Sequence, residues 1–319
     1  MVIQLLRSLY DHNIPVQQQG EVYEHILKEI ELFSISPQVY QLLQNTDSLE
    51  QVPPFFAERL KQHFKRGLVH NLFMKRVEDD VLRCFEQWRM EVIPLKGTRF
   101  AQRYFGHVAA RVTSDVDLLV QADMLDTAIQ RLVSIGFEFE IIKDHHARLM
   151  KNGMMVELHW TLDKQHWSDL DAAPFWREAQ PAEGFSYVKQ LSDLHSFYFI
   201  CLHGARHQMD SIRYVLDVAQ VLYRHGDRID LQALLDQAAA DKTAKRLQAV
   251  LSIVYQVFPR LHTRYPLPFE PIETHWSYDT LKNARHGTRT KKYYLYKLFF
   301  RHFIYDTFKH QMKSIHKPY

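Results

Sequence analysis

The sequence has few cysteines, no long apolar run and little net charge, and each of these absences excludes a class of protein. Cys84 and Cys201 are the only cysteines among 319 residues, and they lie far apart without metal-type spacing. This excludes a disulfide framework and fits a reducing compartment, so we expect a cytoplasmic protein. No apolar run approaches the roughly 20 residues that span a bilayer, and the first residues lack a signal-peptide pattern, so we expect no membrane insertion. The formal net charge of +3 excludes a molecule that binds polyanions over its whole surface.

The composition, 46% hydrophobic and 24% charged, is that of a globular chain long enough for two or three packed units. Apolar residues repeat at helical spacing through residues 1–89, which we expect to form a helical N-terminal region. In residues 90–185, strand-like runs alternate with amphipathic segments, and Asn152-Gly153 marks a hairpin. Residues 186–319 are helical in pattern and end in a basic, aromatic tail. We therefore predict an α+β fold, with a small mixed β-sheet core flanked by helical regions.

The segment "RVTSDVDLLV", residues 111–120, places two aspartates at the start of a strand-like apolar run. On a strand, Asp115 and Asp117 face the same side, about 6.5–7 Å apart along the chain. Two carboxylates on one face repel each other unless a cation lies between them, and Mg²⁺ takes oxygen ligands of this kind. The alternative is a pair of solvated or capping acids. We assign that role to Asp169 and Asp171, which have the same spacing without a strand or glycine turn nearby.

Two further segments offer groups that suit phosphate chemistry. In "MVELHW", Glu157 and His159 share one strand face, so pairing near the aspartates would make Glu157 a third carboxylate; an exposed hairpin face is the alternative. Three carboxylates suit a site in which two metal ions, about 3.5–4 Å apart, clamp a phosphoryl group. In "PLKGTRF", Gly97 lets the backbone approach a phosphate at a strand-to-helix turn, Thr98 adds a hydroxyl and Lys96 a cation. A plain turn with a solvated lysine is the alternative, and Walker spacing is absent.

Taken together, these three segments resemble the bacterial "uncharacterised nucleotidyltransferase" family of the DNA polymerase β-like nucleotidyltransferase superfamily. The resemblance covers roughly residues 90–225. The matching residues, in the order of the family's motifs, are Leu95-Lys96-Gly97, Arg111, Asp115, Asp117, Leu118-Leu119-Val120 and Glu157-Leu158-His159-Trp160. The resemblance implies a nucleotidyltransferase core at residues 90–185, a short mixed sheet with a helical partner domain that closes the cleft.

The resemblance also implies a metal site made of the three acids. Asp115 and Asp117 would bind Mg²⁺, or Mn²⁺, together with the triphosphate of an NTP or another activated nucleotide donor. Glu157 would hold the metal or activate the acceptor hydroxyl. The third acid is a glutamate where the superfamily more often has an aspartate, and its longer side chain would bind the metal less tightly or act purely as a base.

The remaining residues implied by the resemblance would bind substrate. They are Lys96, Gly97, Thr98, Arg111, Ser114, His159, His203 and Asp217. Gly97 and Thr98 would cradle the β- and γ-phosphates, and Lys96 and Arg111 would neutralise developing charge. The turn is Gly-Thr where the superfamily has Gly-Ser, which keeps the hydroxyl, and the spacing from this turn to Asp115 is longer than in minimal members.

Two pairs in the later helical region are spaced four residues apart. His203 and His207 have a spacing that zinc sites use, but no third ligand stands in a zinc-protease position, so we favour a pair that lines the core or the cleft. Arg213 and Asp217 most simply predict an ion pair along one helix, with Asp217 reaching the cleft as the alternative.

The tail interleaves aromatic residues with ten basic residues counted from Lys282, against one acid, Asp306. Such a segment can bind nucleic acid or a membrane surface. We favour an amphipathic helix that packs its aromatic residues on the domain and leaves its lysines in solvent.

The sequence therefore predicts a metal-dependent enzyme that moves a nucleotidyl, or related phosphate-linked, group to a hydroxyl or phosphate. The resemblance points to a peptide or small-molecule acceptor in a bacterial tailoring pathway, and the basic tail would support an RNA acceptor. The alternative is a catalytically inactive nucleotide- or RNA-binding protein on the same fold. The intact set of Asp115, Asp117 and Glu157 argues against it.

Overall fold

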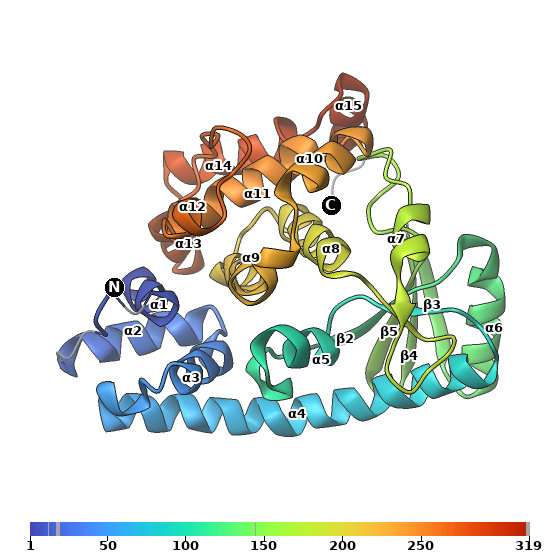
Figure 1. Ribbon diagram of the computed structural model, residues 1–319, viewed down its shortest axis with the longest axis horizontal. Coiled ribbons are helices and arrows are strands. Elements are labelled where there is room, and N and C mark those ends of the chain that lie inside the picture. Colours follow the sequence, from blue (N-terminus) through green and yellow to red (C-terminus); the bar gives the residue numbers. More distant parts are fainter. Residues whose placement is uncertain (12, 17–19, 144, 317–319) are drawn as a thin grey trace.

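The computed structural model describes residues 1–11, 13–16, 20–143 and 145–316 of the chain. It contains helices at both ends and a five-stranded mixed sheet between them (Figure 1), which confirms the predicted α+β class. The N-terminal elements are α1 (Val2–Tyr10), α2 (Gly20–Leu32), α3 (Ser36–Asn45), η1 (Leu49–Gln51) and α4 (Pro54–Gln87).

Helix α4 is 34 residues long and runs beneath both the N-terminal helices and the sheet (Figure 1). It begins at Pro54, where the ring fixes a backbone angle that suits the first helical position. Near its start, Phe56 and Leu60 are buried in the hydrophobic cluster shared with the N-terminal and C-terminal helices. Near its end, Val81 and Phe85 belong to a second cluster beneath the sheet. The helix therefore contributes to two cores, and the division at residue 89 remains a prediction.

The five-stranded sheet has the order β1-β2-β5-β4-β3. Its strands are β1 (Ile93–Pro94), β2 (Asp115–Leu119), β3 (Glu138–Lys143), β4 (His146–Lys151) and β5 (Met154–His159). Only β2 and β5 run parallel to each other; the other neighbouring strands are antiparallel. The parallel register sets Asp117 opposite Glu157, so the two acids lie side by side on neighbouring strands.

The β4–β5 hairpin forms at the predicted position. Asn152 and Gly153 both have positive φ, at 50° and 76°, as a two-residue type I′ turn requires. On the apolar side of β2, Val116 and Leu118 are buried in the cluster beneath the sheet. This alternation keeps the aspartates of β2 on the other side.

Short elements connect the strands of the sheet and lead to a second, two-stranded sheet. They are α5 (Thr98–Phe100), η2 (Ala101–Phe105), η3 (Val108–Ala110), η4 (Ala122–Met124), α6 (Leu125–Ser134), α7 (Ala173–Glu178), β6 (Gln180–Pro181) and β7 (Lys189–Gln190). Asp171 behaves as expected, because its carboxylate accepts a hydrogen bond from the backbone N–H of Ala173, at the start of α7. Asp169 instead has a partner, since its Oδ1 lies 3.3 Å from Nε2 of the buried His310.

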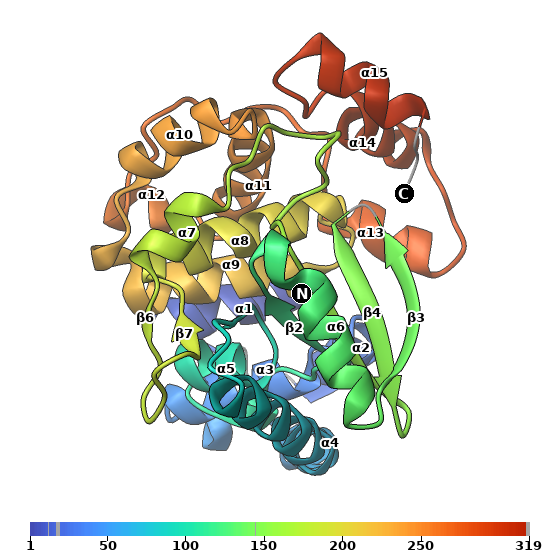
Figure 2. The same ribbon diagram turned by 90° about the vertical axis from the view of Figure 1, so that its right-hand side faces the viewer.

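The C-terminal helices lie on the side of the molecule opposite α4 (Figures 1 and 2). They are α8 (Asp193–Arg206), α9 (Ile212–His225), η5 (Gly226–Arg228), α10 (Leu231–Ala240), α11 (Ala244–Val257), α12 (Leu261–Arg264), α13 (Tyr278–Arg285), α14 (Lys291–His302) and α15 (Phe308–His316). None of the helices in the described residues is both long and apolar enough to cross a membrane.

The basic, aromatic tail forms α14 and α15, and its packing agrees only in part with the expectation. Tyr296 and Phe300 of α14 are buried against the domain. Tyr294, Leu295 and Leu298 are instead 59%, 47% and 47% exposed on the other side of the helix. Lys317, the last of the ten basic residues, lies outside the described residues.

Candidate functional site

The two aspartates of β2 converge on one lysine. The Lys96 Nζ atom lies 3.2 Å from Oδ2 of Asp115 and 2.9 Å from Oδ2 of Asp117. Lys96 follows β1, the antiparallel neighbour of β2, so its backbone is held beside the carboxylates by strand pairing. The ammonium therefore supplies the cation that two like charges on one strand face require.

Burial and charge act in opposite directions on these groups. Burial alone would raise the pKa of Asp117, but the charge of Lys96 and the hydrogen bond from His159 outweigh it and hold this pKa well below its ordinary value. Burial alone would lower the pKa of Lys96, but Asp117 and Asp115 together raise it. Both groups are therefore charged at neutral pH.

Glu157 lies beside Asp117 in a different electrostatic environment. Its pKa is raised, first by burial and then by the neighbouring charge of Asp117. Its Oε1 atom lies 3.3 Å from a guanidinium nitrogen of Arg148 and 3.5 Å from Nε2 of His146. Among the three acids, Glu157 is therefore a better proton acceptor than Asp117, whose pKa is lowered.

His159 joins the two buried acids, which a sequence motif alone does not specify. Its Nε2 atom lies 3.0 Å from Oδ1 of Asp117 and 3.6 Å from Oε2 of Glu157. Asp117, Glu157 and His159 each present a ligand atom within 4.8 Å of the others. The buried Oδ2 of Asp117 accepts no hydrogen bond of normal geometry, although it faces the Lys96 ammonium. This donor set fits a divalent cation.

Gly97 and Thr98 form the predicted turn after β1, and the Thr98 hydroxyl contacts Glu78 of α4. Gly97 has φ of 90°, a conformation that favours glycine. Thr98 is buried, and its hydroxyl donates a hydrogen bond to Glu78 of α4. In this structure the Thr98 hydroxyl donates to Glu78, and its contact with a phosphate remains a prediction.

Glu78 is a buried acid that the sequence pattern does not reveal, because it stands among ordinary polar residues of a long helix. Burial raises its pKa to about 7, although the hydrogen bond from Thr98 and the charge of Arg99 act in the other direction. The Arg99 Nε atom lies 3.6 Å from Oε1 of Glu78. This contact ties α4 to the glycine turn beside Lys96.

The predicted helix ion pair between Arg213 and Asp217 is wrong. Asp217 instead accepts from Nε of Arg111, which lies 2.9 Å from both carboxylate oxygens. Arg111 and Asp217 are 3% and 1% exposed at their side chains. Arg213 donates to the backbone oxygen of Val112 at 2.6 Å. The prediction failed because helix spacing cannot reveal a partner more than 100 residues away that neutralises the same buried acid.

Of the other predicted substrate-binding residues, Ser114 is exposed and its hydroxyl donates to Oδ1 of Asp115 at 3.1 Å. His203 and His207 lie on or just after α8 with ring centroids 4.8 Å apart. Burial first, and then the nearby positive charges including Lys96, lower the pKa of both, that of His207 to about 4. Both rings are therefore neutral at pH 7. Among the described residues, neither belongs to a group of three metal-ligating side chains.

Arg206 is a further residue that the sequence analysis missed. It ends α8, and its guanidinium donates to Nε2 of His145 at 2.8 Å and to the backbone oxygen of Leu162 at 2.7 Å. Its charge is close enough to Asp117 and Glu157 to be influenced by them. Nothing in the local sequence around Arg206 signals these contacts, because its partners lie in the turn before β4 and in the segment after β5.

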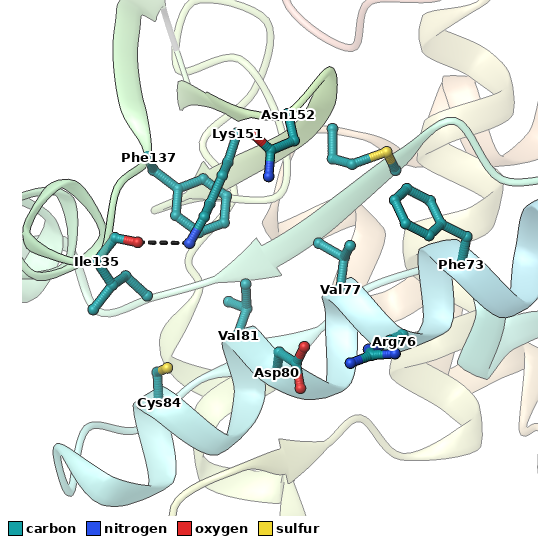
Figure 3. A pocket seen from close by; sticks show the side chains of 11 residues that line it. Phe73, Arg76, Val77, Asp80, Val81, Cys84, Ile135, Phe137, Lys151 and Asn152 are labelled. Atoms are coloured by element: carbon teal, nitrogen blue, oxygen red, sulfur yellow. Dashed lines mark hydrogen bonds between the residues drawn. The ribbon is translucent and has the colours of Figure 1, made fainter.

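A separate cavity of about 400 Å³ lies between α4 and the hairpin (Figure 3). Apolar side chains such as Phe73, Val77 and Phe137 line it, and Lys151 donates to the backbone oxygen of Ile135 at its edge. None of the residues predicted for the site lines this cavity. This cavity is therefore separate from the carboxylates at β2 and β5.

Comparison with known proteins defines the class of this chain. A family model for uncharacterised nucleotidyltransferases matches residues 22–259, about three quarters of its length. The protein is thus a nucleotidyltransferase enzyme. The chain belongs to the uncharacterised nucleotidyltransferase family.

The other comparisons are more distant. A solved structure, "Crystal Structure of ANT(2")-Ia in complex with adenylyl-2"-tobramycin", is similar to this chain at 12% identity. The likeness covers 50% of this chain and 91% of that chain, and its TM-score of 0.35 is too low to carry an argument. No curated protein matches the chain.

A double-mutant cycle tests the corrected ion pair. Asp217→Ala leaves the Arg111 guanidinium buried without a counter-charge, so we expect the free energy of unfolding to fall by about 3–5 kcal/mol. Arg111→Met and Arg213→Met are each made alone and together with Asp217→Ala. Urea unfolding of these variants then gives the coupling free energy of Asp217 with each arginine. Strong coupling to Arg111 and weak coupling to Arg213 is expected; the reverse pattern would restore the helix pair.

The raised pKa of Glu78 predicts how stability changes with pH. The folded value is about 7 against an ordinary 4.5, so the unfolded chain loses this proton first and stability falls as pH rises through this interval. The fall is at most about 1.4 kcal/mol per pH unit. Glu78→Gln keeps an acceptor for Thr98, and we expect it to flatten this part of the urea-unfolding profile. Glu58→Gln, an exposed change on the same helix, serves as the control; equal slopes in both variants would contradict the assignment.

Proposed function

We propose that this enzyme transfers a nucleotidyl group from an NTP to a hydroxyl or phosphate of an acceptor, with a divalent cation such as Mg²⁺ held by Asp115, Asp117 and Glu157. The observation that supports it is that Asp115 and Asp117 of β2 both contact Lys96, and that Glu157 lies opposite Asp117 on the parallel neighbouring strand β5. A bound divalent cation would offset the charge of the triphosphate and polarise the transferring phosphoryl group.

The protein's own groups suit the remaining parts of such a transfer. The acceptor oxygen bonds to the α-phosphorus, the bond from that phosphorus to the bridging oxygen breaks, and pyrophosphate leaves. Glu157, with its raised pKa, is placed to take the proton of an acceptor hydroxyl. Lys96, which stays charged between two acids, can offset negative charge on the leaving pyrophosphate. Gly97, at its positive φ, lets backbone N–H groups approach phosphate oxygens.

For the acceptor we propose a peptide or a small molecule, in a bacterial tailoring pathway and in the cytoplasm. An RNA acceptor is the variant that the basic tail supports, and co-purified RNA or a steep salt dependence of RNA binding would distinguish it. A nucleotide-binding protein without turnover is the second candidate. It would bind NTP with metal but release no pyrophosphate with any acceptor.

The chain contains its own control for the metal site, because the Asp-x-Asp spacing occurs twice. We expect Asp115→Ala/Asp117→Ala to weaken metal-dependent NTP binding by more than about 100-fold, since loss of a supporting contact alone costs about 10–100-fold. Asp169→Ala/Asp171→Ala has the same spacing beside α7 and should bind as the wild type does. The measurement is calorimetry with Mg²⁺ and each of the four NTPs, with circular dichroism to check folding.

Two outcomes would count against the proposal. Equal NTP binding by the wild type and by Asp115→Ala/Asp117→Ala would remove the carboxylates from the site. If the folded wild type bound none of the four NTPs, free nucleotides would be excluded as donors, and nucleotide-sugars would be tested next.

A further inference from the structure

Asp117, Glu157 and His159 each present a ligand atom at β2 and β5, and these three atoms lie within 4.8 Å of one another. Nε2 of His159 lies 3.0 Å from Oδ1 of Asp117 and 3.6 Å from Oε2 of Glu157. Ligands about 2.1 Å from a metal are separated by about 3.0 Å in octahedral and about 3.4 Å in tetrahedral geometry. The two observed distances therefore match edges of a coordination shell that contains an imidazole nitrogen.

A second buried histidine, His146, lies beside Glu157 and has ring nitrogens without hydrogen-bond partners. His146 is 8% exposed, neither of its ring nitrogens has a hydrogen-bond partner, and its Nε2 lies 3.5 Å from Oε1 of Glu157. A buried polar atom without a partner is costly, which favours a ligand that these nitrogens can bind. His145 is different: its Nε2 accepts from Arg206, so its proton is on Nδ1 and it has no free lone pair for a metal.

We propose that His159 is a metal ligand together with Asp117 and Glu157, with His146 as a further donor, and that this site prefers a first-row transition-metal ion to Mg²⁺. When the metal binds, the proton that His159 Nε2 donates to Asp117 moves to Nδ1, which is buried without a hydrogen-bond partner. The proposal rests on the proposed function and deepens it. Imidazole ligands suit ions such as Co²⁺ and Zn²⁺, whereas Mg²⁺ demands oxygen ligands in a rigid geometry. The other side of Asp117, where its Oδ2 and that of Asp115 face Lys96, presents oxygen donors only.

Cobalt binding tests this preference without any nucleotide. We expect the wild type to bind Co²⁺ at least about 100-fold more tightly than Mg²⁺, with visible absorption bands of a nitrogen-containing site. His159→Gln keeps an N–H donor for Asp117 but removes the ligand nitrogen. We expect it to lose about tenfold or more in Co²⁺ affinity and little in Mg²⁺ affinity. His310→Gln is the matched control, because His310 is another buried histidine beside an aspartate, Asp169.

A purely positioning role for His159 would give a different result. If His159 only positions Asp117 through a hydrogen bond, His159→Gln will bind Co²⁺ with the wild-type affinity and spectrum, and the proposal fails. Calorimetry with Mg²⁺ and NTP on the same preparations separates this failure from that of the proposed function. If NTP binds but His159→Gln leaves Co²⁺ affinity unchanged, only the assignment of His159 as a metal ligand fails. If Co²⁺ binds as expected but no NTP binds, only the proposed nucleotide donor fails.

A second inference comes from the charge of the C-terminal segment. Residues 280–319 contain ten Lys and Arg residues and one acid, Asp306, so their net charge is +9. The whole chain has a net charge of +3, which leaves −6 on residues 1–279. The basic charge is thus concentrated in α14, α15 and the residues around them.

One face of α14 combines this charge with exposed apolar side chains. A groove of about 570 Å³ is lined by Tyr294, Leu295 and Leu298 and bordered by Lys291 and Arg301. The opposite face of the helix is buried against the domain, so the exposed side chains are not those that hold α14 in place. A basic helix with an apolar face in solvent is typical of helices that lie on membrane surfaces.

We propose that this face of α14 docks on an anionic phospholipid surface. The positive charge is complementary to acidic headgroups, and leucine side chains gain by leaving water for the acyl boundary. The exposed side chains of this face are two leucines and one tyrosine, so it offers more aliphatic surface for acyl chains than aromatic rings for base stacking. The helix lies on the surface and does not span it.

Vesicle flotation tests this surface. We expect the protein to float with phosphatidylglycerol vesicles, to bind phosphatidylcholine vesicles at least about tenfold more weakly, and to be released by added salt. Leu295→Ser/Leu298→Ser should weaken binding by about tenfold. Val69→Ser/Leu72→Ser is the matched control, because it removes two exposed apolar side chains from α4. Equal binding to both vesicle types, no loss in the α14 variant, or binding of single-stranded RNA without vesicle binding would overturn the proposal.

Discussion

The site depends on the compensation of buried negative charge at the start of β2. Asp117 is 3% exposed and cannot remain ionised there without partners. Lys96 approaches it from the neighbouring strand β1 and His159 from the parallel strand β5, each within 3.0 Å. Lys96 follows β1 and His159 ends β5, and these two strands flank β2. The order of the strands therefore decides whether the charge of Asp117 is compensated. A sheet with another strand order would leave this carboxylate buried and unpaired.

Two other buried contacts hold the surroundings of that cluster in place. Arg111, just before β2, pairs with Asp217 of α9 and so joins the sheet to the C-terminal helices. Thr98, just after Lys96, donates to Glu78 of α4 and joins the glycine turn to the helix below. A polar or ionic group that loses its partner in a buried site costs more than the contact itself contributes. These pairs therefore restrict how α4, α9 and the sheet can be arranged around the acids.

The two buried acids of the site differ in proton affinity because their surroundings differ. Asp117 is held ionised by Lys96, whereas the pKa of Glu157 is raised by burial and by Asp117 itself. Such a difference between neighbouring carboxyl groups keeps Asp117 ionised and makes Glu157 the better proton acceptor. The imidazoles of His203 and His207 are neutral because burial and nearby positive charges, including Lys96, lower their pKa. They therefore add no further positive charge beside Lys96.

Local patterns in the sequence determined the strands, the hairpin at Asn152-Gly153 and the shared face of Asp115 and Asp117, because strand alternation and turn geometry depend only on neighbouring residues. They also carried the resemblance to a nucleotidyltransferase family, which the match over residues 22–259 confirms. Only the tertiary structure decided that Asp217 pairs with Arg111, that Thr98 donates to Glu78 and that His159 contacts Asp117. Those partners lie far apart in the chain, and burial rather than spacing selects them, since each removes an uncompensated polar group from the interior.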